Sequence, residues 1–154
     1  MKHEPSAGVV VLDVGDDRIA AGLLDLQRLA YSVEAGLIGH GGIPQLTETL
    51  TELRAADLRW LGVTDEEGLP VAAIAYSWAG DVLDIERLVV HPALFRRGLG
   101  SRLVAALPPA PVVVVSTGRD NRPARRLYQR LGFDHVEDVE VAPGLWVSRL
   151  RRDG

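Results

Sequence analysis

A glycine-containing segment between a strand and a helix is the part of the sequence best suited to bind an anion. The segment Phe95–Ser101 reads Phe-Arg-Arg-Gly-Leu-Gly-Ser and follows an apolar strand. The first N–H groups of a helix have no intrahelical acceptor, and the helix dipole places partial positive charge there. Gly98 and Gly100 let a phosphate approach the main chain, and Arg96 and Arg97 add positive charge. We expect a phosphate-bearing ligand here, although two glycines also suit a tight turn without one.

The charge distribution favours the same segment. The net charge is −4, but residues 1–94 carry six basic against fifteen acidic residues, and residues 95–130 carry eight arginines against one acidic residue. One basic segment in an acidic chain favours a polyanionic ligand, or else two solvated helix faces rich in arginine. A nucleic-acid binder is usually basic overall, and aromatic residues make up only 5% of this chain. We therefore expect no nucleic-acid partner.

Several other chemistries are excluded by residue type or spacing. The chain has no cysteine, which rules out disulfides, thiolate metal sites and cysteine nucleophiles. The Phe95–Ser101 segment lacks the Lys-Ser/Thr of a P-loop, and Leu103 stands where a dinucleotide fingerprint needs its third glycine. The four histidines are scattered and form no ligand pattern, so we expect no metal site; they are His3, His40, His91 and His135.

A second segment, residues 121–132, is expected to form a helix with a tyrosine on its apolar face. Asn121 can cap this helix, Pro123 suits its first turn and Gly132 ends it. Tyr128 recurs with leucine and alanine at helical spacing, so it should point towards a sheet. On periodicity alone Tyr128 suits a core position as well as a functional one.

The elements that hold these segments indicate a single domain over residues 1–154. The composition is that of a globular protein, with 47% hydrophobic residues and a mean hydropathy of +0.08. Periodicity and turn residues predict strands at 9–14, 60–64, 70–78, 82–90, 112–115, 133–141 and 145–150, and helices at 18–36, 44–55, 98–107 and 121–132. The run of four valines at 112–115 predicts cover on both faces. The expected fold class is α/β (α+β): a mixed, mostly antiparallel central sheet of about seven strands flanked by about four helices.

Together, the two motifs resemble those of the GNAT N-acetyltransferase superfamily. That family places Gln/Arg-x-x-Gly-x-Gly/Ala at a helix start, and here the frame falls on Phe95–Gly100, with Phe95 at the Gln/Arg position. Residues 121–133 resemble the family's second cofactor motif, which contains an Asn and a Tyr. The resemblance implies that acetyl-CoA binds as co-substrate to Leu88, Val89, Val90, Phe95, Arg96, Arg97, Gly98, Leu99, Gly100, Ser101, Asn121 and Tyr128. It also implies that Tyr128 is the general acid for the leaving thiol.

The residue that accepts the proton of the acceptor amine is less clear from the sequence. Strand alternation places Asp84 and Glu86 on one face with Leu88 and Val90, where an acceptor would approach. Glu86 is the predicted base, directly or through a water, with Asp84 as its rival. A solvated carboxylate without a catalytic role is an equal alternative.

The first two helices and the 39–44 connector are expected to form the acceptor site. Its polar residues would be Tyr31, Glu34, His40 and Glu48. The acceptor itself is not identified, and the acidic N-terminal part is compatible with a cationic amine or a lysine side chain.

The predicted function is direct acetyl transfer from acetyl-CoA to a primary amine of a small molecule, a lysine or an N-terminus. The alternatives are a non-catalytic acyl-CoA sensor or interaction module, and a transferase that uses another acyl-CoA. No segment has the length or hydropathy of a membrane span or secretory signal, so we expect a cytoplasmic protein without a membrane partner. The sequence does not fix the oligomeric state, and a homodimer is compatible with it.

Overall fold

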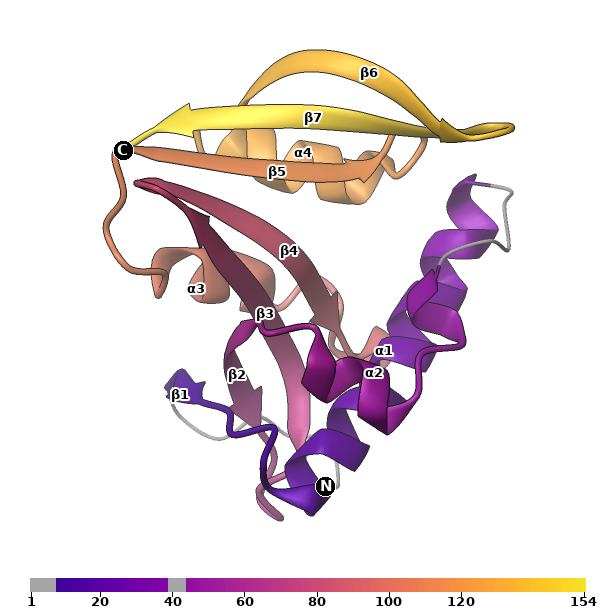
Figure 1. The fold of residues 1–154 in the computed structure, drawn as a ribbon, viewed down its shortest axis with the longest axis vertical. Coiled ribbons are helices and arrows are strands. Elements are labelled where there is room, and N and C mark those ends of the chain that lie inside the picture. The colour runs from indigo at the N-terminus through magenta and orange to yellow at the C-terminus, as the bar shows by residue number, and fades with distance from the viewer. Residues whose placement is uncertain (1–7, 39–43) are drawn as a thin grey trace.

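The computed structural model describes residues 8–38 and 44–154 of the chain (Figure 1). In chain order, the strands are β1 Val10–Val11, β2 Arg59–Thr64, β3 Pro70–Ala79, β4 Val82–Val90, β5 Val112–Gly118, β6 Asp134–Ala142 and β7 Leu145–Asp153. The α-helices are α1 Asp17–Ile38, α2 Leu50–Ala55, α3 Leu99–Ala105 and α4 Arg122–Arg130, with 3-10 turns η1 at Pro44–Leu46 and η2 at Pro92–Leu94.

The seven strands of the described chain form one sheet in the order β1-β2-β3-β4-β5-β7-β6. Every neighbouring pair is antiparallel except β4 and β5, which are parallel. The predicted fold class, a mixed and mostly antiparallel sheet with helices on its faces, is confirmed.

The parallel pair splits the sheet into two halves. β4 and β5 are paired only from Val82 to Ile85 and from Val112 to Val115. Beyond these residues the strands diverge like the sides of a V, and α1 lies at the open end (Figure 1). Just after the last pair, β4 carries an extra residue, since Ala75 lies opposite Arg87 while Tyr76 lies opposite Ile85. This β-bulge at Glu86 bends the strand where the split begins.

Helices cover the two faces of the sheet unequally. One core cluster packs α3 and α4 against the sheet, and a second packs α1 and α2 against β2, β3 and β4. On β5, Val113 and Val115 are buried by the first cluster, but Val112 and Val114 are only half-buried. The predicted cover on both faces of the valine run was therefore wrong, because α1 and α2 cover only the N-terminal half of the sheet.

Local capping explains where the helices differ from their predicted bounds. The predicted helix at 44–55 is a 3-10 turn followed by α2, because Thr49 starts a new helix with a capping box. In that box Glu52 N–H donates to Thr49 Oγ1 at 3.2 Å, and Thr49 N–H donates to Glu52 Oε1 at 3.1 Å. α4 begins as predicted, with the Ala124 N–H donating to Asn121 Oδ1 at 3.3 Å. Among the helices of the described ranges, none has both the length and the apolar character needed to cross a membrane.

Candidate active site

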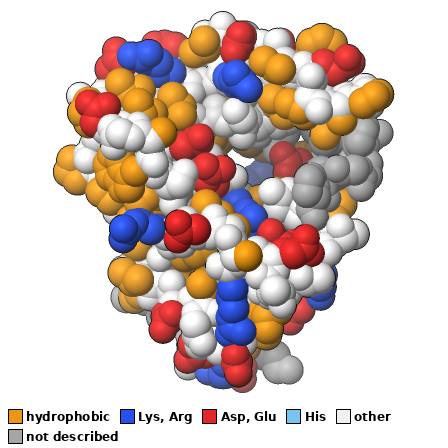
Figure 2. Space-filling model, in the orientation of Figure 1, with side chains coloured by type: hydrophobic (Ala, Val, Ile, Leu, Met, Phe, Trp, Pro, Cys, Tyr) orange, Lys and Arg blue, Asp and Glu red, His pale blue; other side chains and the backbone are white. Residues whose placement is uncertain are grey.

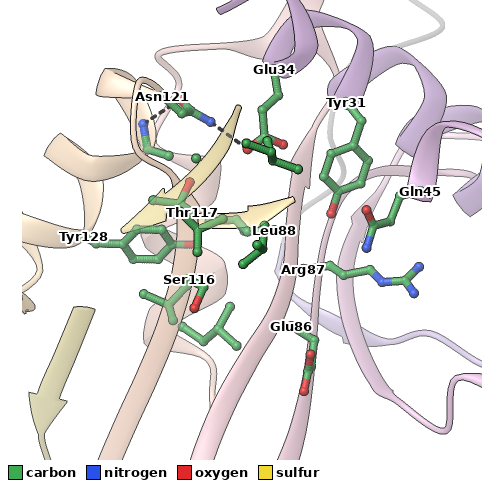
Figure 3. Close-up of a pocket in the computed structure, with 17 residues that line it drawn as sticks. Tyr31, Glu34, Gln45, Glu86, Arg87, Leu88, Ser116, Thr117, Asn121 and Tyr128 are labelled. Carbon is green, nitrogen blue, oxygen red and sulfur yellow. Dashed lines mark hydrogen bonds between the residues drawn. The ribbon is translucent and has the colours of Figure 1, made fainter. Parts of the chain in front are cut away.

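A cleft of about 290 Å³ opens where β4 and β5 diverge. Its walls come from α1, η1, β4, β5, α4, β6 and β7, so it joins segments from most of the chain (Figure 3). Figure 2 shows a hollow near the middle of one face, with acidic side chains on two sides of it. The lining residues include the predicted site residues Glu86, Leu88, Asn121 and Tyr128 and the predicted acceptor residues Tyr31 and Glu34.

Two tyrosine hydroxyls point into this cleft from opposite walls (Figure 3). Tyr128 is 3% exposed and its ring packs edge-on against Phe133, with ring centroids 5.4 Å apart. Tyr31 is 9% exposed on α1. Within residues 8–38 and 44–154, neither hydroxyl has a hydrogen-bond partner. Burial raises the pKa of Tyr128 above its ordinary value, and Tyr31 and Glu34 add to this, so the Tyr128 hydroxyl is protonated at neutral pH.

Glu34 reaches across the open end of the V to the other half of the sheet. The Asn121 Nδ2 amide donates to Glu34 Oε1 at 3.2 Å, and the Gly118 N–H also donates to this carboxylate. Burial raises the pKa of Glu34, and these two hydrogen bonds only partly offset it. Asn121 therefore both caps α4 and holds the α1 carboxylate in place.

The bulge at Glu86 changes which face of β4 the acidic residues occupy. Leu88 packs against the same core cluster as Ile85, so Asp84 lies on the opposite face from Leu88. The predicted sharing of one face by Asp84, Glu86, Leu88 and Val90 was wrong, because strict alternation ends at the extra residue. Glu86 is exposed and accepts a hydrogen bond from Ser77 Oγ at 2.7 Å.

The Asp84 carboxyl group has a raised pKa. Its pKa is raised from 3.8 to about 6, first by burial and then by the Glu86 charge, against an opposing effect of Arg149. Asp84 lies in the paired part of β4, opposite Val114 of β5, whereas Glu86 lies where the two strands separate and is the one of these two residues that lines the cleft.

A buried charged network behind the cleft was not predicted from the sequence. Arg87 donates to both oxygens of Glu48, at 2.6 and 2.8 Å, and to Gln27 Oε1 at 2.8 Å. Burial alone would raise the pKa of Glu48, but hydrogen bonds from Arg87 and Gln27 and the Arg87 charge hold it below the ordinary value. Arg87 also lies over the Trp60 ring at 5.8 Å. The only sequence signal was an arginine in an apolar strand, which does not reveal its partner 39 residues away.

Glu48 thus serves this network, and the predicted acceptor role of His40 falls outside the described residues. His91 is a turn residue, as expected, since its Nδ1 accepts the Ala93 N–H at 3.0 Å.

The Phe95–Ser101 segment connects η2 to α3 with two left-handed residues. Arg96 has φ 67° and Gly98 has φ 75°. Gly98 faces open space, whereas a Cβ on Gly100 would meet Leu127 Cδ2 at 3.0 Å, so Gly100 lets α3 pack closely on α4. In the described chain, the N–H groups from Gly98 to Ser101 have no acceptor. Consecutive free N–H groups around left-handed residues form an anion-binding concavity.

The described residues fit an elongated ligand with a diphosphate at one end. After Ile85 the main chain of β4 has no partner strand on the β5 side, so its peptide groups can pair with an extended amide chain. The free N–H groups of residues 98–101 follow beyond the end of this strand. Among the described residues, no group of three or more His, Asp or Glu side chains is arranged to hold a metal ion.

Comparison with known proteins identifies the family. The family model described as the acetyltransferase (GNAT) domain matches residues 57–135, about half of the chain. The chain therefore belongs to the GNAT acetyltransferase family, and the resemblance drawn from its motifs is confirmed. UPF0157 protein YqkA of Bacillus subtilis (strain 168) is 37% identical over an alignment of 134 residues, which covers 84% of this chain and 39% of that protein. The chain spans about two-fifths of the length of that relative.

Two solved structures share the fold. The ribosomal-protein-S18-alanine N-acetyltransferase from Escherichia coli has a TM-score of 0.73 at 14% identity, with 95% of this chain and 92% of that chain covered. The yncA protein of Salmonella typhimurium, solved with its cofactor acetyl-CoA, has a TM-score of 0.67 at 16% identity, with 97% and 94% covered.

Proposed function

We propose that this chain is an N-acetyltransferase that moves the acetyl group of acetyl-CoA directly to a primary amine of a small molecule, a lysine or an N-terminus. The observation that carries the proposal is the cleft itself: unpaired β4 main chain on one wall, free loop N–H groups beyond it and a buried, protonated tyrosine facing in. The absence of cysteine agrees with transfer that forms no covalent enzyme intermediate.

The cofactor-binding residues are assigned by position. Along Leu88, Val89 and Val90, the main-chain groups that face away from β3, those of Leu88 and Val90, can pair with the pantetheine amides, because no described strand pairs with them on the β5 side. Within the loop from Phe95 to Ser101, residues 98–101 offer their free N–H groups to the diphosphate, with Arg96 and Arg97 nearby for charge. Asn121 and Tyr128 line the same cleft from the α4 side. When bound, acetyl-CoA would supply the thioester that the amine attacks.

Tyr128 is the proposed general acid. Its hydroxyl faces the cleft, has no partner among the described residues and keeps its proton at neutral pH because burial raises its pKa. It is therefore free to give that proton to the leaving thiolate, and it can recover one from the attached nitrogen, which is positively charged after attack and must lose a proton to become a neutral amide.

Glu86 remains the proposed base and Asp84 its rival. Glu86 lines the cleft at the bulge, and its exposure suits transfer of the amine's proton through a water molecule. Asp84 has a pKa raised to about 6, in the range that suits a general base, but it does not line the cleft. A cytoplasmic location stays a prediction from the sequence.

The decisive experiment mixes the protein with acetyl-CoA and a panel of primary amines and records thiol release. Release that depends on one class of amine, with the acetylated amine identified by mass spectrometry, supports the proposal. Binding of acetyl-CoA without release for every amine would contradict it and favour a sensor. Competition among acetyl-, propionyl- and succinyl-CoA tests the choice of acyl group.

A further inference from the structure

Within the part of the chain that the structure describes, the half-buried carboxylate of Glu34 has no positively charged partner. Its two hydrogen-bond partners, the Asn121 amide and the Gly118 N–H, are both neutral. The charge of Glu48, by contrast, is neutralised by a bidentate ion pair with Arg87. Removing a charged carboxylate from water without a neighbouring cation costs free energy, and the raised pKa of Glu34 reflects this cost. A cation from outside the described chain would reduce this cost.

Tyr31 provides an independent sign of a ligand at the same place. It lies one helical turn before Glu34, so both side chains leave the same face of α1. Its side chain is buried to more than nine-tenths, yet its hydroxyl faces the cleft and has no hydrogen-bond partner among the described residues. A hydroxyl that opens into the cleft beside a carboxylate, with no partner in the described chain, suits a ligand that donates hydrogen bonds.

A cation that stays bound to Glu34 during acetyl transfer is a different nitrogen from the one that is acetylated. An amine attacks through its lone pair and must therefore be neutral, whereas an ion pair requires that the nitrogen keep its proton. Among the described residues, Arg87 is the one arginine that lines the cleft, and it is already held by Glu48 and Gln27. A second, protonated nitrogen of the acceptor would supply the positive charge that no described residue supplies to Glu34.

We propose that Tyr31 and Glu34 bind a second, protonated amino group of the acceptor, and that the preferred acceptor is a small aliphatic diamine. This inference rests on the proposed acetyl transfer and specifies its substrate class. One amino group binds at Glu34 as an ammonium ion, while the other loses its proton and receives the acetyl group.

The test compares diamines of two to five carbons with amino alcohols of the same lengths, in which a hydroxyl replaces the second amine. For the wild type, kcat/KM for the best diamine should exceed that for its amino alcohol at least tenfold. Glu34→Gln should reduce this ratio to within about threefold of one, because it lowers kcat/KM for the diamine far more than kcat/KM for the amino alcohol. Asp25→Asn removes an exposed charge from the same helix and should leave the ratio unaltered.

Three outcomes would overturn the inference: no preference for diamines in the wild type, an unchanged preference in Glu34→Gln, or an equal loss for both acceptors. The last would make Glu34 a base or a structural residue. Should Glu34→Gln fail to fold, Glu34→Asp, which shortens the side chain by one methylene, should move the preference to a longer diamine. An unmoved preference would count against the inference.

The failure of the proposed function is distinguishable from the failure of this inference. Acetylation of amines without a diamine preference defeats only the inference. If no amine releases thiol, the proposed function fails, and calorimetric titration with 1,4-diaminobutane then decides whether Tyr31 and Glu34 bind a diamine at all. Heat that is lost in Glu34→Gln supports such binding, and no heat contradicts it.

Discussion

Replacing Asp84 with asparagine should raise the free energy of unfolding at neutral pH. Burial, and then the neighbouring Glu86 charge, raise the pKa of Asp84 from 3.8 to about 6. Each pH unit of difference between folded and unfolded pKa is worth about 1.4 kcal/mol, which gives about 3 kcal/mol for a fully shielded group. Asp84 is only partly buried, so solvent screening reduces the expected gain to about 1.5 kcal/mol.

The variant is expected to be more stable because Asp84 loses its proton at a lower pH in the unfolded chain than in the folded one. As the pH rises from 3.8 to about 6, Asp84 ionises in the unfolded chain but stays protonated in the folded one. The unfolded state is favoured over that range, so the wild type loses stability that the asparagine variant keeps. The difference in stability between Asp84→Asn and the wild type reaches its full size above about pH 6, and it vanishes below the pKa of Asp84 in the unfolded chain.

Urea denaturation at about pH 7.5 and about pH 4.5 measures this difference. The stabilisation by Asp84→Asn should be roughly three times larger at the higher pH. Asp25→Asn, an exposed carboxylate on α1, is the matched control and should change stability by less than about 0.5 kcal/mol. Equal effects at the two pH values, or destabilisation at about pH 7.5, would refute this account of the Asp84 environment.

Four other changes test separate parts of the structure. Gly98→Asp should bind acetyl-CoA about tenfold more weakly than Gly98→Asn, as measured by titration calorimetry. Both substituted residues tolerate φ 75° in open space, and only the aspartate repels a diphosphate. Equal affinities of the two variants would show that the loop is not part of the binding site. Tyr128→Phe keeps the ring packing and should lower kcat at least tenfold with little change in acetyl-CoA affinity, so a wild-type rate would reassign the acid. Glu86→Gln should shift the acidic limb of the pH–rate profile. An unaltered limb would indicate that Asp84 or water accepts the proton of the amine, or that the reaction uses no dedicated base. Arg87→Met should lower the free energy of unfolding by about 3–5 kcal/mol, measured by urea denaturation, because it leaves the Glu48 carboxylate without its cation. A loss below about 1 kcal/mol would refute the role of Arg87 as the partner that stabilises Glu48.

The sequence was sufficient for features that depend on local signals. Asn121 and Pro123 marked the start of α4 because capping and proline preferences act within one helical turn. The bounds of β4 were predicted correctly as 82–90, since the His91-Pro92 pair follows the strand directly and disfavours its continuation. The GNAT motifs combined such local signals, which is why the family could be identified before the structure.

Features that depend on pairing between distant segments could not be predicted. The bulge at Glu86 exists only because of how β4 registers against β3, and it reversed the predicted face of Asp84. The contact between Glu34 and Asn121 joins residues 87 positions apart, and neither residue type reveals the other. The same holds for Arg87 and Glu48, whose ion pair forms only when α1 and η1 close over the sheet.

The most direct test of the central claim is a calorimetric titration of the wild-type protein with acetyl-CoA and with free CoA. If the V between β4 and β5 and the loop at 95–101 form the acyl-CoA site, each ligand should give saturable heat with one site per chain. An absence of heat for both ligands would contradict the assignment of the cleft and of the loop.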